Sequence, residues 1–311
     1  MYDSLYNNPF LKEKLKARVI VNPISGRGRH PQDDISDLNR IFAAHGIESQ
    51  VICQGKVGEA TLLAREAVAE GFDMVVAVGG DGTINEVVCG LVNSGVPLGI
   101  VPAGSGNGLA REFGIPLKMS EACKTIIHGD TREVDVGAMN DRFFLGTAGI
   151  GYDALLVKIF EERWANRRGV LPYFYVAIKG FFKHKPSLMH LRFDDHQLTV
   201  IPLLVTVANS TQFGGGAIIA PQAEPDDGLL DVCIIHNLNF LQAFYHWPKL
   251  FVGCIDRMPQ WVTYRTDALE ILSDLPMPVQ VDGESVQEST HLKIKLLPRA
   301  LGIRVPKGTH N

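Results

Sequence analysis

Residues 73–87 read DMVVAVGGDGTINEV, and this stretch determines how the first half of the chain folds. The β-branched apolar run over 73–78 predicts a buried strand, and the apolar spacing of 84–93 predicts a short helix. The glycines between them let the backbone approach a bulky ligand, and amides at the start of a helix attract an anion such as phosphate. The Asp81 carboxylate would repel that phosphate unless a metal ion or a proton-donating hydroxyl lay between them. The loop therefore indicates chemistry, with a strand-to-helix turn that binds nothing as the alternative.

The composition is that of an ordinary globular protein with one large core or two smaller ones. The 311 residues are 46% hydrophobic and 21% charged, and the net charge of −4 gives no general attraction to nucleic acid. The five cysteines are widely spaced without a Cys-x-x-Cys pair, so a reducing cytoplasm fits better than a disulfide framework or a zinc site. There is no apolar signal core, and no apolar run approaches the ~20 residues of a transmembrane helix. We expect a cytoplasmic protein without a transmembrane segment.

Strand and helix patterns alternate four times in the first third of the chain. This alternation is typical of a parallel sheet covered by helices. Glycine-rich loops follow three of the strands, at 22–28, 79–83 and 104–108. Because ligands bind at the carboxyl ends of parallel strands, the three loops should converge on one edge of the sheet. The strands are expected at 17–21, 48–53, 73–78 and 96–101.

The pattern changes from about Thr131, where strands follow one another with few helices between them. A hairpin is expected around Asn140-Asp141, and the later strands predict an antiparallel sandwich or barrel-like domain. We therefore expect an α/β domain over 17–133 and a β-sandwich domain over 134–299, and it stays open whether the last strand, 300–305, returns to the first domain. The later strands are expected at 188–194, 198–208, 228–236, 260–272, 278–282, 291–297 and 300–305.

A helical insertion is expected at 153–184, and the surrounding segment 158–192 is both basic and aromatic. It contains eight Lys or Arg, two Glu and seven of the 25 aromatic residues of the chain. Cations meet anionic headgroups and aromatic rings lie at the membrane boundary, so this composition suits an element at a membrane surface. A helical pair packed on the sheet, with a solvated basic face, is the alternative that the sequence leaves open.

Other motifs are weaker. There is no P-loop sequence, and the Gly149–Ala154 match to the dinucleotide fingerprint lacks the βαβ frame and is interpreted as chance. The Asp-Gly pairs within 226–231 and 281–285 are typical of hairpin turns. Glu284 would serve as a general base provided that the fold brings it near the Asp81 loop.

Taken together, three motifs resemble the diacylglycerol kinase catalytic domain family, which includes sphingosine and ceramide kinases and soluble bacterial lipid kinases. They are Gly-Gly-Asp-Gly-Thr at 79–83, Asn-Pro-x-Ser-Gly at 22–26 and Pro-Ala-Gly-Ser-Gly-Asn at 102–107. The likeness continues over nearly the whole chain, through 213–216, 221–231 and 281–284. It implies an α/β nucleotide-binding domain of the NAD kinase and diacylglycerol kinase type, followed by an antiparallel β-sandwich, with ATP and lipid meeting between the two.

The resemblance also implies roles for individual residues. Glu284 resembles the family's proton acceptor, oriented through Asp135, and Asp81 is expected in the shell of a catalytic Mg²⁺. Whether Asp81 or Glu284 removes the lipid proton stays open. A structural Mg²⁺ site is implied at the carbonyls of Glu224 and Leu229 and the carboxylate of Asp227, since oxygen ligands suit a hard cation. The positions that resemble ATP-binding residues are Asn22, Pro23, Ser25, Gly26, Cys53, Gly79, Gly80, Asp81, Gly82, Thr83, Asn85, Ser105 and Asn107, of which Cys53 departs from the Thr usual in bacterial members.

The function that the resemblance implies is transfer of the γ-phosphoryl of ATP to a lipid hydroxyl at a membrane surface. The lipid is open between diacylglycerol and a sphingoid base or ceramide, with a slight preference for the sphingoid class because the third loop has Ser105 and Gly108. An NAD kinase and a catalytically silent lipid-binding protein are the alternatives. A nucleic-acid binder is not expected without a basic recognition motif, and a homodimer formed through exposed strand edges stays open.

Overall fold

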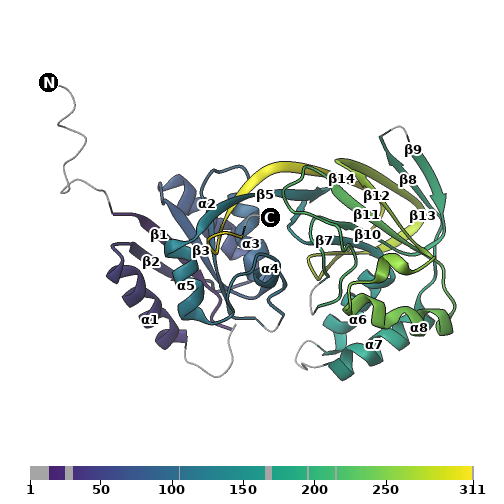
Figure 1. Cartoon of the computed structure of the whole chain (residues 1–311), viewed down its shortest axis with the longest axis horizontal. Helices are drawn as coiled ribbons and strands as arrows, with labels where there is room; N and C mark the ends of the chain where they lie inside the picture. Colours follow the sequence, from purple (N-terminus) through teal and green to yellow (C-terminus); the bar gives the residue numbers. More distant parts are fainter. Residues whose placement is uncertain are drawn as a thin grey trace.

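A parallel sheet covered by helices forms the first half of the chain, on the left of the computed structural model in Figure 1. The structure describes residues 14–24, 31–104, 106–164, 170–194, 196–213 and 216–309. The strands lie in the order β4, β3, β1, β2, and neighbouring strands run parallel, which confirms the predicted α/β class. The elements are β1 (Lys16–Val21), α1 (Pro31–Ala44), β2 (Glu48–Cys53), α2 (Glu59–Ala69), β3 (Met74–Gly79), α3 (Asp81–Leu91), β4 (Leu98–Pro102), α4 (Gly108–Glu112) and α5 (Met119–His128).

The strand β3 lies inside this sheet, and all of its residues are buried. A parallel strand covered on both faces has no solvent side, which is why its sequence is a continuous apolar run. Beside the sheet, α2 and α3 cross closely: a Cβ atom on Gly90 would lie 2.6 Å from the Ala64 Cβ atom and 2.7 Å from the Thr61 carbonyl oxygen. The small residues at this crossing let α2 and α3 pack closely, and this packing fixes the position of α3. Because α3 begins at the glycine-rich loop, the position of the loop is fixed as well.

The second half of the chain is mostly antiparallel, as expected for a β-sandwich. Its central strands lie in the order β12, β11, β10, β7, β13, with a hairpin of β8 and β9 attached to β13. Helices gather on one side of these strands, at the lower right of Figure 1. The elements are β7 (Thr147–Gly151), α6 (Tyr152–Trp164), α7 (Val170–Lys183), β8 (Met189–Phe193), β9 (His196–Val200), β10 (Pro202–Ala208), β11 (Leu230–His236), α8 (Phe240–Phe251), the 3₁₀ turn η1 (Ile255–Arg257), β12 (Trp261–Thr266) and β13 (Ala268–Val281).

Two long strands connect the halves, β5 (Asp130–Met139) and β14 (Glu284–Val305). They pair antiparallel along most of their length, and Ile303 near the end of β14 lies beside Leu98 of the first sheet. Figure 1 shows β14 as the yellow band that runs from one half to the other. Because β14 also pairs with β13, one hydrogen-bonded sheet continues through both halves.

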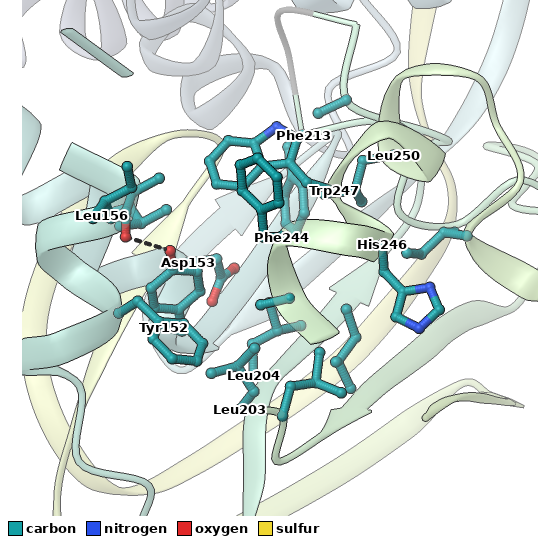
Figure 2. Close-up of a pocket in the computed structure, with 18 of the residues that line it drawn as sticks. Tyr152, Asp153, Leu156, Leu203, Leu204, Phe213, Phe244, His246, Trp247 and Leu250 are labelled. Carbon is teal, nitrogen blue, oxygen red and sulfur yellow. Dashed lines mark hydrogen bonds between the residues drawn. The ribbon is translucent and has the colours of Figure 1, made fainter. Parts of the chain in front are cut away.

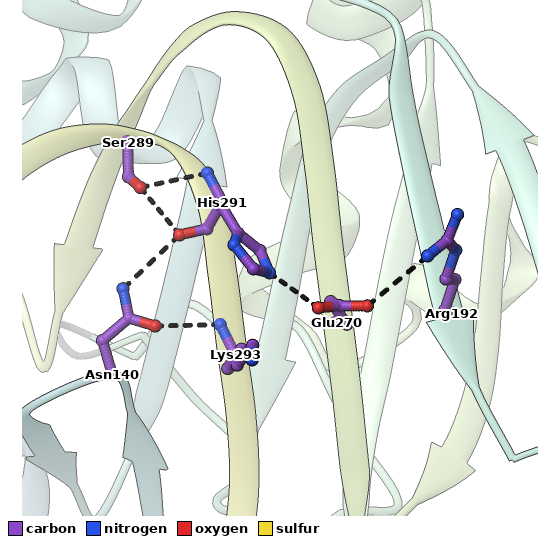
Figure 3. A network of polar contacts seen from close by, with 6 residues as sticks. All are labelled: Asn140, Arg192, Glu270, Ser289, His291 and Lys293. Atoms are coloured by element: carbon purple, nitrogen blue, oxygen red, sulfur yellow. Dashed lines mark hydrogen bonds and ion pairs between the residues drawn. The ribbon is translucent and has the colours of Figure 1, made fainter.

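A polar network fixes the outer part of this sheet (Figure 3). Asn140 in the turn between β5 and β6 (Arg142–Phe144) accepts a hydrogen bond from the Lys293 amide at 2.9 Å. The neighbouring His291 ring lies 2.7 Å from Glu270 of β13, which faces Arg192 of β8 at 3.8 Å. The hydrogen bond to His291, aided by the nearby cations, lowers the pKa of Glu270. The hairpin expected at Asn140-Asp141 is confirmed. The hydrogen bond from the Lys293 amide to Asn140 fixes how β14 aligns with this hairpin.

Several expected boundaries are wrong. The helix α3 begins at Asp81 rather than at Ile84, so part of the glycine-rich loop is the first helical turn. The run 260–272 is two strands that separate at Asp267, and 291–297 with 300–305 is one strand that continues through an irregular pairing. Helix α8 was not expected. For α8 a signal exists: Asn239 and Gln242 form a reciprocal capping box at its start.

Candidate active site

Within the described residues, Asn22 at the start of the first loop and the second and third loops meet at the carboxyl edge of the first sheet, in agreement with the predicted convergence. The side-chain amide of Asn22 donates to the Thr83 hydroxyl at 3.0 Å and so joins the first loop to the second. The second and third loops touch through glycines: a Cβ atom on Gly104 would lie only 2.5 Å from the Gly80 Cα atom. A side chain at either position would separate the loops. Ser25, Gly26 and Ser105 lie outside the described residues.

Asp81 is the first residue of α3, and its side chain is directed at the third loop. One carboxylate oxygen accepts a hydrogen bond from the Leu109 amide at 3.1 Å, and the other faces Gly106, where a Cβ atom would lie 3.2 Å away. Asn107 has a left-handed conformation with φ 51°, and its side chain bonds the amide and carbonyl of Gly104 at 2.9 and 3.1 Å. These bonds hold the third loop against Asp81.

The remaining predicted nucleotide residues of the first half occupy the same edge. Thr83 packs against Gly79, where a Cβ atom would lie 2.6 Å from the Thr83 Cβ atom. Cys53 ends β2 opposite Val21 and is exposed, and Pro23 is exposed in the first loop. A ligand on this edge would therefore meet these residues together with the loop glycines.

Glu284 comes to this site from the other half of the chain. It follows the two-residue turn of Asp282 and Gly283, whose φ angles of 46° and 82° suit the Asp-Gly hairpin turn. Its carboxylate oxygen Oε1 lies where a side chain at Gly82 would point, since a Cβ atom there would be 2.4 Å from it. Glu284 therefore lies near the Asp81 loop, which is the condition for it to serve as a general base. The absence of a side chain at Gly82 leaves the space that the Glu284 carboxylate occupies.

The surroundings of Glu284 raise its pKa. Partial burial of the carboxyl group is the largest cause, the carboxylates of Glu86, Glu161 and Asp282 add to it, and Arg142 opposes it. A carboxylate with a raised pKa accepts a proton more readily than an ordinary glutamate does. The site therefore combines a basic carboxylate with the first turn of α3.

Asp282 connects the two halves of the site. Its carboxylate accepts hydrogen bonds from the amides of Leu145, Gly146 and Thr147 at 2.8 to 2.9 Å and from the side chain of Asn85 at 2.7 Å. Burial raises the pKa of Asp282, and the four donors oppose this effect. Asn85, expected among the nucleotide-binding residues, thus contacts the second half of the chain. The sequence does not single out Asp282, although an aspartate before a turn glycine and a functional glutamate is a usable signal.

Asp135 has other partners than expected. Its buried carboxylate accepts bonds from the Gly228 amide at 2.8 Å and the Arg299 amide at 2.7 Å, and its own amide donates to the Pro225 carbonyl. Within the described residues no hydrogen bond joins it to Glu284. Asp135 therefore fixes the loop at 225–229 against β14, and the expected orientation of Glu284 through it is not a direct contact.

The residues expected at a structural Mg²⁺ site share this loop. Asp227 pairs with Arg265 and accepts a bond from the Leu229 amide at 3.0 Å, and Glu224 is exposed. Burial and the carboxylates of Asp227 and Glu224 raise the pKa of Asp231 to about 6, against the effect of Arg265. The oxygens suit a hard cation. In the structure, however, the positive charge beside Asp227 comes from the guanidinium group of Arg265. No cluster of three His, Cys, Asp or Glu side chains suited to a metal ion occurs in the described part of the chain.

Two hollows reach the turn of Asp282 and Gly283 that precedes Glu284. A small cleft of about 40 Å³ is lined by Asp81 and Glu112 from one half and Gln212, Phe213 and Asp282 from the other. An apolar cavity of about 210 Å³ lies between α6, α7 and α8 and the strands β10 and β11 (Figure 2). Phe213 lines both hollows, and the cavity extends to Gly283, immediately before Glu284.

Comparisons with known proteins agree with this arrangement. Residues 16–139 match the diacylglycerol kinase catalytic domain, and residues 146–305 match the YegS C-terminal NAD kinase beta sandwich-like domain. A probable lipid kinase YegS-like protein of Chromohalobacter salexigens is 31% identical over 275 residues, which are 86% of this chain and 86% of that protein. A diacylglycerol kinase of Bacillus subtilis is 32% identical over 232 residues, covering 73% of this chain and 76% of the relative.

The chain therefore belongs to the diacylglycerol kinase catalytic domain family. Within that family it is similar to bacterial diacylglycerol kinases and YegS-like lipid kinases. A crystal structure of a diacylglycerol kinase from Bacillus anthracis has the same fold, with a TM-score of 0.72 at 22% identity over 93% of this chain and 96% of that one.

The role of Asp282 is testable by its removal. Asp282→Ala leaves four donors without their acceptor, so the free energy of unfolding should fall by about 3 kcal/mol or more, measured by urea denaturation. Asp274→Ala, which removes an exposed carboxylate from β13, is the matched control and should change it by less than about 0.5 kcal/mol. Equal effects of the two substitutions would contradict the connecting role of Asp282.

Proposed function

We propose that this protein is an ATP-dependent kinase that phosphorylates a hydroxyl group of a membrane lipid. The observation that supports this most is the position of Glu284 over Gly82, beside the Asp81 loop and next in the chain to Gly283, which lines an apolar cavity. A phosphate-binding edge, a basic carboxylate and an apolar cavity are the three parts that such a reaction needs, and here they adjoin one another.

The phosphates of ATP would lie at the edge where the glycine-rich loops meet. The amides at the start of α3 provide a partial positive charge for an anion, and the close contact of Gly80 with Gly104 leaves the loops free of side chains that would block it. Asn22, Pro23, Cys53 and Asn107 stand around this edge and are proposed to contact the nucleotide. When Mg²⁺ is bound with ATP it neutralises phosphate charge, and Asp81 is the carboxylate proposed to hold it.

Glu284 is proposed as the base. Its raised pKa suits proton removal, whereas one oxygen of Asp81 already accepts a bond from Leu109. The lipid oxygen would form a bond to the γ-phosphorus as its proton passes to Glu284, and the bond from that phosphorus to the ADP oxygen would break. Positioning and charge neutralisation supply most of the rate in reactions of this type.

The apolar cavity is proposed to hold a hydrocarbon part of the lipid. It is lined almost entirely by aliphatic and aromatic side chains from α6, α7, α8 and the strands behind them, as Figure 2 shows around Leu156, Phe244 and Trp247. A second dinucleotide, as in an NAD kinase, would find few polar partners there. The apolar lining therefore favours a lipid as the acceptor.

Helices α7 and α8 are proposed to dock on the membrane. None of the residues of α8 is buried although most are apolar, and Leu241 and Tyr245 are 77% and 74% exposed. The rings of Phe182 and Phe240 lie 5.2 Å apart and join the two helices. Exposed Lys183 and neighbouring basic residues complement anionic headgroups.

Because α8 also lines the cavity, docking would place the cavity beside the bilayer. Within the described residues, no helix is long and apolar enough to span a membrane.

A parallel assay tests the reaction. The full chain is incubated with labelled ATP and, separately, with diacylglycerol, sphingosine, ceramide or NAD. We expect a phosphorylated lipid, and we expect Asp81→Asn to lower turnover by about 10³-fold while circular dichroism stays unchanged. Labelling of NAD alone would support the NAD kinase alternative, and ATP binding without transfer to any acceptor would support the silent lipid-binding protein.

The pH dependence tests the base. Because Glu284 must be ionised to accept a proton, activity should rise with pH through its raised pKa, at a higher pH than for an ordinary glutamate. Glu284→Gln should remove most activity.

The stability of the glutamine variant tests the raised pKa itself. A raised pKa means that ionised Glu284 destabilises the folded state, so Glu284→Gln should melt at a higher temperature than the wild type at neutral pH. This difference in melting temperature should vanish below the pKa that Glu284 has in the unfolded state.

A second variant displaces Glu284 without removing it. Gly82→Ala adds a Cβ atom 2.4 Å from the present position of the Glu284 carboxylate, whose flexible side chain must move away. We expect reduced activity with little change in melting temperature, because alanine suits a helical position better than glycine. Full activity in both Gly82→Ala and Glu284→Gln would contradict the proposed base.

Vesicle sedimentation tests membrane docking. The double variant Leu241→Ser, Tyr245→Ser should bind vesicles of phosphatidylcholine and phosphatidylglycerol at least about 10-fold more weakly, because it removes exposed apolar contacts from α8. Leu275→Ser is the matched control, since Leu275 is 64% exposed on β13. Equal vesicle binding by the wild type and the α8 variant would contradict docking through this helix.

A further inference from the structure

The hairpin turn that carries Glu284 is held by helix α6, a contact that the reaction proposed above does not use. Ser285, the residue after Glu284, donates its amide to Oε1 of Glu161 at 3.0 Å and its hydroxyl to Oε2 of the same carboxylate. Glu161 lies in the third turn of α6, 124 residues earlier in the chain. One carboxylate therefore accepts both polar hydrogens of the residue next to the proposed base.

The residue before Glu284 is connected to the same helix through Gln280. The Gln280 side-chain oxygen accepts a hydrogen bond from the Gly283 amide at 2.8 Å, and its nitrogen lies 3.5 Å from Oδ2 of Asp153 in the first turn of α6. Asp153 is buried, and a Cβ atom on Gly149 would lie 1.7 Å from its Oδ2, so only glycine leaves room for it. Both neighbours of Glu284 in the chain are thus linked to α6.

A salt bridge aligns α6 with the first residues of β14. The Lys158 Nζ atom lies 2.9 Å from Oε1 of Glu288, about one turn before Glu161 on the helix and three residues after Ser285 on the strand. Both side chains are half-exposed, so the pair contributes little to stability. Together with the bonds of Ser285 it fixes the rotation of α6 against the start of β14.

Helix α6 also forms part of the apolar cavity. Leu156 and Val157, about one turn before Glu161, belong to the cavity wall. The helix that holds the segment of the proposed base is therefore also a wall of the proposed acceptor site, which suits a residue with a role in the reaction.

The charged groups that act on the Glu284 carboxyl group come from α3, α6, β6 and its own turn. The carboxylates of Glu86, Glu161 and Asp282 raise the pKa of Glu284, in addition to burial, whereas Arg142 opposes them. Glu161 therefore acts on Glu284 in two ways, through the hydrogen bonds to the next residue and through its negative charge.

We propose that Glu161 is a positioning residue for the base: by binding Ser285 it fixes where the Glu284 carboxylate lies over Gly82. Its negative charge, placed beside that carboxylate, also favours the uptake of a proton there. The inference rests on the proposed kinase function and adds a residue of α6 to its site. Glu161 acts through Ser285 and is not itself a catalytic residue.

Substitutions of Glu161 in the full-length protein test the positioning. Glu161→Ala removes both hydrogen bonds to Ser285, and we expect it to lower kcat for the phosphorylated lipid by about 10-fold while KM for ATP stays within about twofold. Glu161→Gln keeps an acceptor for the Ser285 amide and should restore most of that kcat. Glu162→Gln, which changes the exposed neighbouring glutamate, is the matched control and should behave like the wild type.

The pH profile separates this role from a merely structural one. Because the charge of Glu161 raises the pKa of Glu284, Glu161→Gln should shift the rise of activity to lower pH, whereas Glu162→Gln should leave it in place. A wild-type kcat in Glu161→Ala would overturn the inference. So would equal losses of kcat in Glu161→Ala and Glu161→Gln, or a pH profile of Glu161→Gln that coincides with that of the wild type.

Melting temperatures at neutral pH give a second test that needs no phosphate transfer. Ionised Glu284 destabilises the folded state in part because of Glu161, so Glu284→Gln should raise the melting temperature less in the Glu161→Gln background than in the wild type. Equal gains in the two backgrounds would overturn the inference. Unequal gains in a protein that phosphorylates no lipid would contradict only the kinase proposal.

Discussion

The structure depends on the hydrogen bonds that converge on the Asp282 carboxylate. Three amides of the turn at 145–147 and the side chain of Asn85 all donate to it. These bonds tie α3 of the first half to the β13–β14 hairpin of the second, and the same hairpin presents Glu284 to Gly82. A network with every donor satisfied is stiff, whereas loss of its one acceptor would leave four donors in a partly buried place. Asp282 therefore holds the two halves together at the site, in addition to the strands β5 and β14 that connect them.

Close approach of backbone atoms is the second constraint, and glycine is what permits it. Gly80 touches Gly104, Gly82 leaves the space taken by Glu284, and Gly149 leaves the space taken by Asp153. In each case a larger residue would displace a loop or a carboxyl group of the site. The two carboxyl groups share a physical situation, since burial raises the pKa of each and makes its charged form costly. Natural proteins accept such destabilisation mainly at functional sites.

Much of the fold was predictable, because local patterns agree with the final structure. The apolar runs and glycine-rich loops of the first half lead directly to parallel strands and to loops on one edge, and Asp-Gly and Asn-Asp pairs form the expected turns. Helix α8 is different: its apolar residues suggest burial, yet none is buried, and its capping box was the better signal. Of the site, Asp81 and Glu284 could be selected by residue type, whereas the partners of Asp135 depend on contacts across more than 90 residues of chain.

The sequence by itself determined the order of strands and helices in the first half, the glycine-rich loops and the chemical types available for a phosphate site. These follow from interactions between near neighbours in the chain, which periodicity and turn residues express directly. Only the tertiary structure decided that Glu284 lies over Gly82, that Asn85 turns from the nucleotide edge to Asp282, and that Asp153 faces an apolar cavity. Such placements arise because β14 runs through both halves and carries distant residues to one point, and no local pattern encodes that distance.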